Sequence, residues 1–142
     1  MKTLLLFLCL VFACSSLAAD RTGEVRATEI AFAKAFADRN ADKFFSYLAE
    51  DAQFLGSKRI MHGKKEVAAV WSEYFKSATA PFRWNPERVV TNAAGDLGYS
   101  TGPVFDESGA QVGTYNSTWM RRPDGSWQIV FDGGSSCPPA AK

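Results

Sequence analysis

Apolar residues recur at three- and four-residue steps through the first half of the chain. This spacing places them along one side of a helix, and it predicts helices over residues 22–38, 41–49 and about 64–77. In the first of these, Glu29 falls near the apolar side, and we expect it at the boundary of that face with its carboxyl reaching water. One short strand, over residues 52–55, is expected between the second and third helices.

The second half of the chain alternates β-branched or aromatic residues with polar ones. Strands are expected over residues 82–91, interrupted or edged at Pro86, and over residues 97–105. A hairpin follows, because Asp124-Gly125 tolerates the positive φ of a tight turn between two strand-like runs. Helices followed by an antiparallel meander predict an α+β domain, with three N-terminal helices packed on a strongly curved antiparallel sheet that forms a cone.

Alternation in the closing hairpin sorts its side chains onto two faces. The set expected to look into the cone is Tyr115, Ser117, Trp119, Gln128, Val130 and Asp132. The set expected on the outside of the last strand is Trp127, Ile129 and Phe131. A face that mixes polar groups with large rings is typical of a small-molecule pocket.

The composition excludes several classes of function. The 142 residues are enough for one domain with a core and too few for two. The formal net charge of +1 provides no footprint for nucleic acid or an acidic membrane surface. The sequence contains no phosphate-binding glycine loop, no Ser-His-Asp order, no Cys-His pair and no metal-ligand spacing, so we expect neither a cofactor nor a metal ion.

Residues 1–19 are typical of a secretory signal peptide. Lys2 provides the positive start, residues 4–13 the apolar stretch, and Ala18-Ala19 the small residues of a cleavage site. We therefore expect a periplasmic or secreted protein, cleaved near Ala18 or Ala19, with no transmembrane helix in its mature form. Two alternatives are an ordinary buried N-terminal helix and lipidation of Cys14, which follows a loose lipoprotein-type box.

Residues 20–134 are expected to form the domain, and residues 135–142 a flexible tail rich in Gly, Ser and Pro. Cys137 is the one cysteine left after cleavage, so it has no partner for an internal disulfide. Its thiol is either exposed or joined by a disulfide to a cysteine of another chain.

Four stretches together resemble the nuclear transport factor 2-like superfamily, and within it the SnoaL-like branch of the domain of unknown function 4440 type. They are AFADRNADKFFSYLAEDAQFL, HGKKEVAAVW, GDLGYSTGPV and GTYNSTWMRRPDGSWQIVFDGG. The resemblance covers residues 22–134 and implies a cystatin-like, ketosteroid isomerase-like cone with an apolar pocket, usually in a homodimer packed through the outer sheet face. Members include ketosteroid isomerase, polyketide cyclases and non-catalytic binding modules, so the resemblance fixes no activity.

The chain departs from ketosteroid isomerase at the positions that carry its chemistry. That enzyme uses a carboxylate base, a tyrosine and a protonated aspartate. Aligned through YLAEDAQF, the tyrosine position carries Phe32, the base position carries Gly56, and the acidic donor falls at about Ser117. Phe32 and Gly56 have no proton to exchange, and a serine is a poorer donor than an acid, so the isomerase reaction is not expected.

Asp132 and His62 are the candidates for proton transfer. Loss of water among aromatic rings would raise the pKa of Asp132, as an acid or base catalyst requires. Alternatively, Asp132 accepts backbone amides at a Gly133-Gly134 turn. His62, the only histidine, precedes the third helix near the expected pocket mouth, and its alternative role is that of a surface or capping residue.

The leading hypothesis is a pocket that binds a small, largely apolar molecule without catalysis. The residues expected to line it are Phe32, Phe36, Phe54, Trp71, Tyr99, Thr101, Tyr115, Ser117, Trp119 and Asp132. Alternatively, these rings fill the cone and leave no usable void. Two other functions stay open: a proton-transfer enzyme, isomerase- or dehydratase-like, that uses Asp132 and perhaps His62, and a homodimeric interaction module that works through its outer sheet face.

Overall fold

The computed structural model describes residues 20–136. The expected signal peptide with Cys14, and the tail residue Cys137, lie outside the described residues. The elements in chain order are α1 (Thr22–Ala37), α2 (Ala41–Ser46), β1 (Leu48–Leu55), β2 (Ile60–His62), α3 (Gly63–Trp71), the 3₁₀ helix η1 (Tyr74–Lys76), β3 (Phe82–Trp84), β4 (Arg88–Thr91), β5 (Leu97–Asp106), β6 (Gln111–Arg121) and β7 (Trp127–Ser136). Across this part of the chain, the structure contains no helix both long and apolar enough to cross a membrane.

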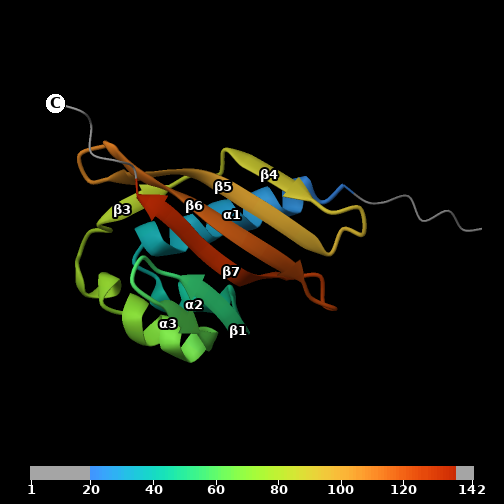
Figure 1. Ribbon diagram of the computed structural model, residues 1–142, viewed down its shortest axis with the longest axis horizontal. Coiled ribbons are helices and arrows are strands. Elements are labelled where there is room, and N and C mark those ends of the chain that lie inside the picture. Colours follow the sequence, from blue (N-terminus) through green and yellow to red (C-terminus); the bar gives the residue numbers. More distant parts are fainter. Residues whose placement is uncertain (1–19, 137–142) are drawn as a thin grey trace, which may run out of the picture.

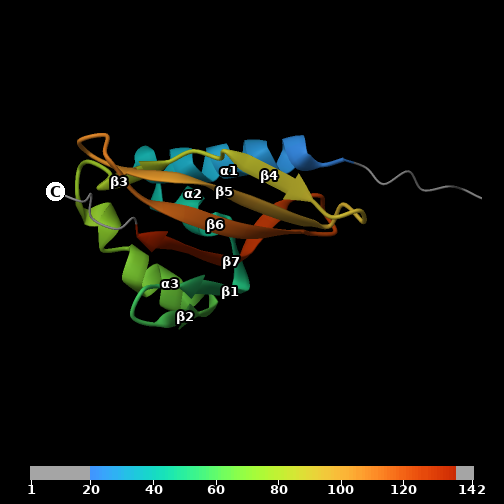
Figure 2. The same ribbon diagram turned by 45° about the horizontal axis from the view of Figure 1, so that its top comes forward.

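Seven strands form one curved sheet in the order β2-β1-β7-β6-β5-β3, and β4 also pairs with β5. Figures 1 and 2 show α1 lying along one face of this sheet, while α3 lies with β1 and β2 at one end. The predicted α+β class is confirmed. One detail differs, because β1 and β7 run parallel and the sheet is therefore mixed. No hairpin joins these two strands, so nothing in the connection forces them to be antiparallel.

Several element boundaries depend on tertiary pairing. The second helix ends at Ser46 rather than at residue 49, because Leu48 pairs with Ile129 of β7 and the carbonyl of Tyr47 accepts the Ile129 N–H at 2.8 Å. The expected third helix divides into α3 and η1. The interruption at Pro86 is confirmed, since β3 and β4 lie on either side of it. Strand β7 continues to Ser136, two residues into the expected tail.

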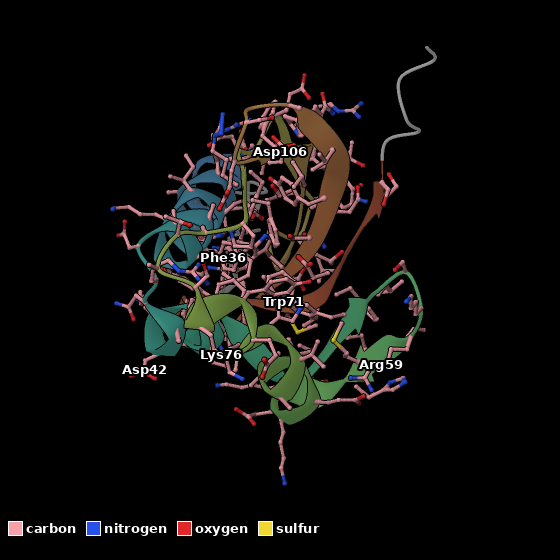
Figure 3. The ribbon with its side chains drawn as sticks, turned by 90° about the vertical axis from the view of Figure 1, so that its left-hand side faces the viewer. Phe36, Asp42, Arg59, Trp71, Lys76 and Asp106 are labelled. Carbon is pink, nitrogen blue, oxygen red and sulfur yellow. The ribbon has the colours of Figure 1, made fainter. Side chains whose placement is uncertain are left out.

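Aromatic rings pack against one another in the core between α1 and the sheet. The ring of Phe32 stacks on Phe44 with centroids 4.4 Å apart, and Phe36 stacks on Phe82 at 4.8 Å. Phe36 also meets the edge of Trp71 at 5.9 Å, and both lie centrally in Figure 3, away from the labelled charged residues at the periphery. These contacts join α1, α2, α3 and β3 into one core.

A bulge in β7 changes which way its side chains point. Thr118 of β6 pairs with Phe131, and the next residue, Trp119, pairs with Ile129, so Val130 is the extra residue. Ile129 is therefore buried at 0% exposure, whereas Phe131 is 52% exposed. Trp127 lies on the buried side too, at 5% exposure.

The expected outer set of β7 is thus wrong for Trp127 and Ile129, which pack inside the protomer. The expected inner set is wrong for Gln128, which pairs with Met120 on the outer face and accepts a hydrogen bond from Arg122. The physical reason is the same in both cases, because one inserted residue reverses the period-two alternation.

Candidate functional site

The cone contains a cavity of about 190 Å³ between α3, β1 and the adjoining ends of β5, β6 and β7. Its walls are mainly apolar, and they include the rings of Phe54, Trp71, Phe82 and Tyr115. Asp132 is the one carboxyl group among its lining residues. The arrangement is typical of a small-ligand pocket, with apolar walls and few polar groups.

Gly133 and Gly134 make the close strand packing beside Asp132 possible. A Cβ atom at Gly134 would run into the carbonyl oxygen of Thr114, and one at Gly133 would come within 3.0 Å of the Leu55 side chain. Both glycines line the cavity and lie inside β7, which continues beyond them. The alternative that Asp132 serves a turn at these glycines is therefore wrong.

Asp132 is held between two neighbouring strands. It is directly opposite Ser117 of β6 and Phe54 of β1, and the Ser117 Oγ lies 2.7 Å from its Oδ2 in a hydrogen bond. The pKa of Asp132 is raised to about 8, mainly by burial and in a smaller part by the negative charge of Glu29, while the Ser117 hydroxyl opposes the shift. An acid with this pKa changes its charge close to neutral pH.

Glu29 lies behind this pocket, in the middle of the core. Its exposure is 0%, so the expectation that its carboxyl reaches water is wrong. The indole N–H groups of Trp84 and Trp119 donate hydrogen bonds of 2.8 and 2.9 Å to its two oxygens. Burial raises the pKa of Glu29, and the hydrogen bonds from the two indoles and from the hydroxyls of Ser100 and Ser117 oppose that shift.

Two serines hydrogen-bond to groups that line the cavity. The Ser117 hydroxyl is bonded to Asp132, and the Ser100 hydroxyl lies 2.8 Å from the phenol oxygen of Tyr115. Both serines are completely buried. Burial, and then the charge of Glu29, raises the pKa of Tyr115, so its phenol stays protonated.

Sequence reasoning missed Glu29 because it treated a charged residue beside an apolar stripe as a boundary residue. The informative signal was the pair Trp84 and Trp119, since indoles only donate hydrogen bonds and need an acceptor when buried. Glu29 lies on the side of α1 that also buries Val25, Phe32 and Phe36. A carboxylate at that position and two tryptophans on strands were therefore compatible partners.

The predicted ligand-binding residues divide into three groups. The first group, Phe54, Trp71, Tyr115 and Asp132, lines the cavity. The buried residues that do not reach it are Phe32, Phe36, Ser117 and Trp119. These four pack or hydrogen-bond behind the cavity wall.

The third group, Tyr99 and Thr101, is not at this cavity. Tyr99 is 42% exposed on the outer side of β5, where its hydroxyl donates to Asn116. Thr101, two residues further along the strand, donates its hydroxyl to the backbone carbonyl of Tyr115. The expectation that both line the cone pocket is corrected, because alternation along β5 sends their side chains away from it.

His62 and Asp132 lie on opposite faces of the sheet. His62 pairs with Gln53 of β1, and its Nδ1 is hydrogen-bonded to the Gln53 side chain. Gln53 in turn pairs with the outward-facing Phe131, one residue before Asp132. The structure therefore does not bring the predicted acid–base pair together.

A second hollow lies at the other end of the molecule, between α2 and the β6–β7 turn. This groove of about 600 Å³ is lined by residues that include Glu24, Lys43, Tyr47 and Arg121. Its carboxylate is already occupied, since Glu24 accepts bonds from Arg21 and from Trp127. Within residues 20–136, no cluster of three or more His, Cys, Asp or Glu side chains is placed to hold a metal ion.

A family model for the SnoaL-like domain matches residues 25–140. The chain belongs to the SnoaL-like domain family. The resemblance to the nuclear transport factor 2-like superfamily is thereby confirmed. Solved structures of a ketosteroid isomerase-like protein and of an NTF2-like protein share the fold of this SnoaL-like domain. A comparison with curated proteins gives no match.

Three solved structures illustrate the shared fold. A protein of unknown function from Pectobacterium atrosepticum has a TM-score of 0.69 at 18% identity, covering 82% of this SnoaL-like chain and 91% of its own. A ketosteroid isomerase-like protein from Erwinia carotovora has a TM-score of 0.66 at 20% identity, covering 84% and 98%. A cystatin-like fold protein from Burkholderia xenovorans has a TM-score of 0.68 at 18% identity, covering 82% and 93%. At these identities the likeness concerns the fold alone.

Proposed function

We propose that the cone pocket binds a small, largely apolar molecule whose single polar group meets Asp132. The observation that carries this proposal is the cavity itself, with aromatic walls and one carboxyl group at β7. An apolar cavity of about 150 Å³ accommodates benzene, so about 190 Å³ suits a ligand of one ring with a small substituent.

The position of the core rings supports the same proposal. Phe32 and Phe36 fill the space under α1, whereas the cavity lies against α3 and β1. Filling the cone and keeping a pocket are therefore compatible, because they concern different parts of the interior. The ligand's apolar body would contact Phe54 and Trp71, and its polar group would face Asp132 and Tyr115.

A thermal-shift screen of one-ring alcohols, ketones, amines and acids tests the proposal. A ligand at a hundredfold excess over its Kd should add about 2.7 kcal/mol to the free energy of unfolding. Val104→Phe, which fills the cavity, should abolish the response, whereas Val112→Phe on the exposed part of β6 should keep it. A panel without any response, or equal responses from both variants, contradicts a binding pocket.

A second candidate function is proton transfer by Asp132. The observation that favours it is a carboxyl group with a pKa of about 8 at the wall of a cavity, beside a protonated tyrosine. In ²H₂O, one-ring ketones should then exchange their α-protons faster with the protein than with Asp132→Asn. His62→Ala should exchange as fast as the unmodified protein, because His62 lies on the other face of the sheet. Equal rates for the protein and Asp132→Asn contradict this candidate.

We also propose that the protein is exported after cleavage near Ala18 or Ala19. The support is the sequence of residues 1–19, with its positive start, apolar stretch and small residues before Asp20. Intact-mass measurement of the protein recovered from the periplasm or the medium is the test. A mass that retains residues 1–19 contradicts cleavage, and a lipid-sized increment on a chain that begins at Cys14 indicates a lipoprotein instead.

A homodimer through the outer sheet face completes the proposal. Val90, Tyr99, Thr118 and Phe131 are cross-strand neighbours in one row over β4, β5, β6 and β7, and three of them are large and exposed. Light scattering should show a dimer that Phe131→Asp converts to a monomer, while Ile30→Asp on α1 leaves it a dimer. A monomer before any substitution contradicts this interface and points to another partner.

A further inference from the structure

Asp132 has one carboxyl oxygen without a partner at the wall of the cavity. Its Oδ2 accepts the Ser117 hydroxyl at 2.7 Å, whereas its Oδ1 has no hydrogen-bond partner within residues 20–136. Among these residues, the only sealed-off side-chain polar atom without a partner is the Nε of Arg121, so Oδ1 is accessible, and Asp132 lines the cavity. An ionised carboxylate only accepts hydrogen bonds. A ligand that meets the ionised Asp132 at Oδ1 must therefore bring a donor.

Aromatic rings bound the cavity from three directions. The planes of Phe54 and Phe82 lie at 89° and 83° to the indole of Trp71, and their centroids are 5.4 and 6.1 Å from it. These three side chains come from β1, β3 and α3, respectively. The face of an aromatic ring carries partial negative charge and attracts ammonium groups, most strongly where water is excluded. Such walls suit the charged end of an amine as well as its hydrocarbon part.

The cavity has no cation of its own. No Lys, Arg or His is among its described lining residues, and no ion pair in this part of the chain includes Asp132. Behind the wall, Glu29 accepts two indole N–H groups and likewise takes part in none of these ion pairs. The site thus combines acids and aromatic rings with no positive charge to balance them, which favours a cationic ligand over an anionic one.

We propose that the ligand of the cone pocket is a one-ring amine that binds as its ammonium cation. Its N–H would donate to the Oδ1 of Asp132 while Ser117 holds Oδ2, and its ring would contact Phe54 and Trp71. The inference rests on the proposed function of the cavity and names the chemical class of the ligand. The volume of about 190 Å³ limits that class to a single ring with a short amine arm, such as benzylamine.

The ammonium group competes with a proton for Asp132. Burial, and in a smaller part the charge of Glu29 of α1, raises the pKa of Asp132 to about 8, so the empty pocket holds a protonated acid at pH 6–7. The other titratable group in the wall is Tyr115 of β6, whose phenol stays protonated, and the remaining lining residues are uncharged. Binding of the cation releases the Asp132 proton to the buffer. The affinity should therefore rise about tenfold from pH 6 to pH 7 and level off above pH 8.

Calorimetric titration with benzylamine and benzyl alcohol tests the inference, because the two probes have nearly the same shape and differ in charge. An alkylamine is charged at neutral pH. At pH 8 benzylamine should bind the unmodified protein at least tenfold more tightly than benzyl alcohol. Between pH 6 and pH 7 the affinity for benzylamine should rise about tenfold, whereas the affinity for benzyl alcohol should change much less.

Asp132→Asn keeps the size of the side chain and removes its charge, so this variant should lose both the preference for benzylamine and its pH dependence. Asp51→Asn, which removes an exposed carboxyl group from β1, is the matched control and should keep both. The comparison of the two probes uses the unmodified protein, so it decides the matter even if Asp132→Asn does not fold.

Three results overturn the amine assignment and leave the pocket itself standing. They are equal or tighter binding of benzyl alcohol, a preference for benzylamine that does not change between pH 6 and pH 7, and a preference that Asp132→Asn retains or that Asp51→Asn loses equally. Absence of binding by both probes, together with silence across the neutral members of the thermal-shift panel, contradicts the pocket and the amine assignment with it.

Discussion

Ile129 and Phe131 are two residues apart on β7, yet Ile129 is completely buried and Phe131 is 52% exposed. In a regular strand these side chains would share a face. The bulge at Val130 separates them, because Thr118 and Trp119 of β6 pair with Phe131 and Ile129 in succession. The same bulge leaves Asp132 opposite Ser117, and it therefore places the Asp132 carboxyl at the cavity.

Ile129→Ala should therefore destabilise the protomer by about 2–5 kcal/mol, as expected for deleting a buried aliphatic side chain. Phe131→Ala should change the free energy of unfolding by about 0.5 kcal/mol or less, measured by urea denaturation at a concentration where the protein is monomeric. The two substitutions lie on one strand, so they share its environment apart from the face. Equal losses would mean that the two side chains lie on the same face and that the bulge is misplaced.

The fold was largely predictable from the sequence because it depends on periodicity. Helical spacing indicated α1 and α3, alternation indicated β5 and β6, and Asp124-Gly125 indicated the last hairpin, in which Gly125 has a φ of 88°. Pro86 marked the break between β3 and β4 for the simple reason that proline cannot donate to a ladder. Each of these signals is local.

The candidate site was less predictable because its main features are not local. A bulge has no fixed sequence signature, so alternation across Val130 gave the wrong face for Trp127, Ile129 and Gln128. Glu29 and Trp119 are 90 positions apart, and nothing near either residue shows that one is the partner of the other. Asp132 was identified because it lies on the near side of the bulge, where alternation from Ser117 still holds.

Trp84→Phe should destabilise the protein more than Trp127→Phe. The two tryptophans are almost equally buried, at 6% and 5% exposure, and each indole donates to a glutamate. Glu29, the acceptor for Trp84, has no access to water, whereas the side chain of Glu24, the acceptor for Trp127, is 45% exposed and can bond to water instead. Leaving a buried acceptor without its hydrogen bond costs about 1–3 kcal/mol.

The difference between the two variants isolates that cost, because both lose similar ring area. We expect Trp84→Phe to lower the free energy of unfolding by about 1–2 kcal/mol more than Trp127→Phe, measured in parallel urea titrations. Indistinguishable midpoints would show that Glu29 does not depend on the indole of Trp84.

Gly102→Ala should destabilise the sheet, whereas Gly23→Ala should not. A Cβ atom at Gly102 would collide with the backbone carbonyl of Asn85 and approach the backbone nitrogen of Glu87, in the connection between β3 and β4. Forcing them apart should cost about 1–3 kcal/mol. Nothing lies within 4 Å of a Cβ at Gly23 in the first turn of α1, so alanine there should stabilise by up to about 1 kcal/mol. Thermal melts of the two variants should shift in opposite directions.

The protonation of Asp132 should make stability fall as the pH rises. Its pKa is about 8 in the folded protein and 3.8 is its ordinary value, so between these values the folded state binds more protons than the unfolded state. The free energy of unfolding should then decrease by up to about 1.4 kcal/mol per pH unit in this window and level off above pH 8. Asp132→Asn lacks the ionisable carboxyl. The free energy of unfolding of this variant should therefore rise relative to that of the unmodified protein from pH 5 to pH 8. Urea midpoints at five pH values check this; parallel curves for the two proteins would mean that Asp132 is ionised throughout.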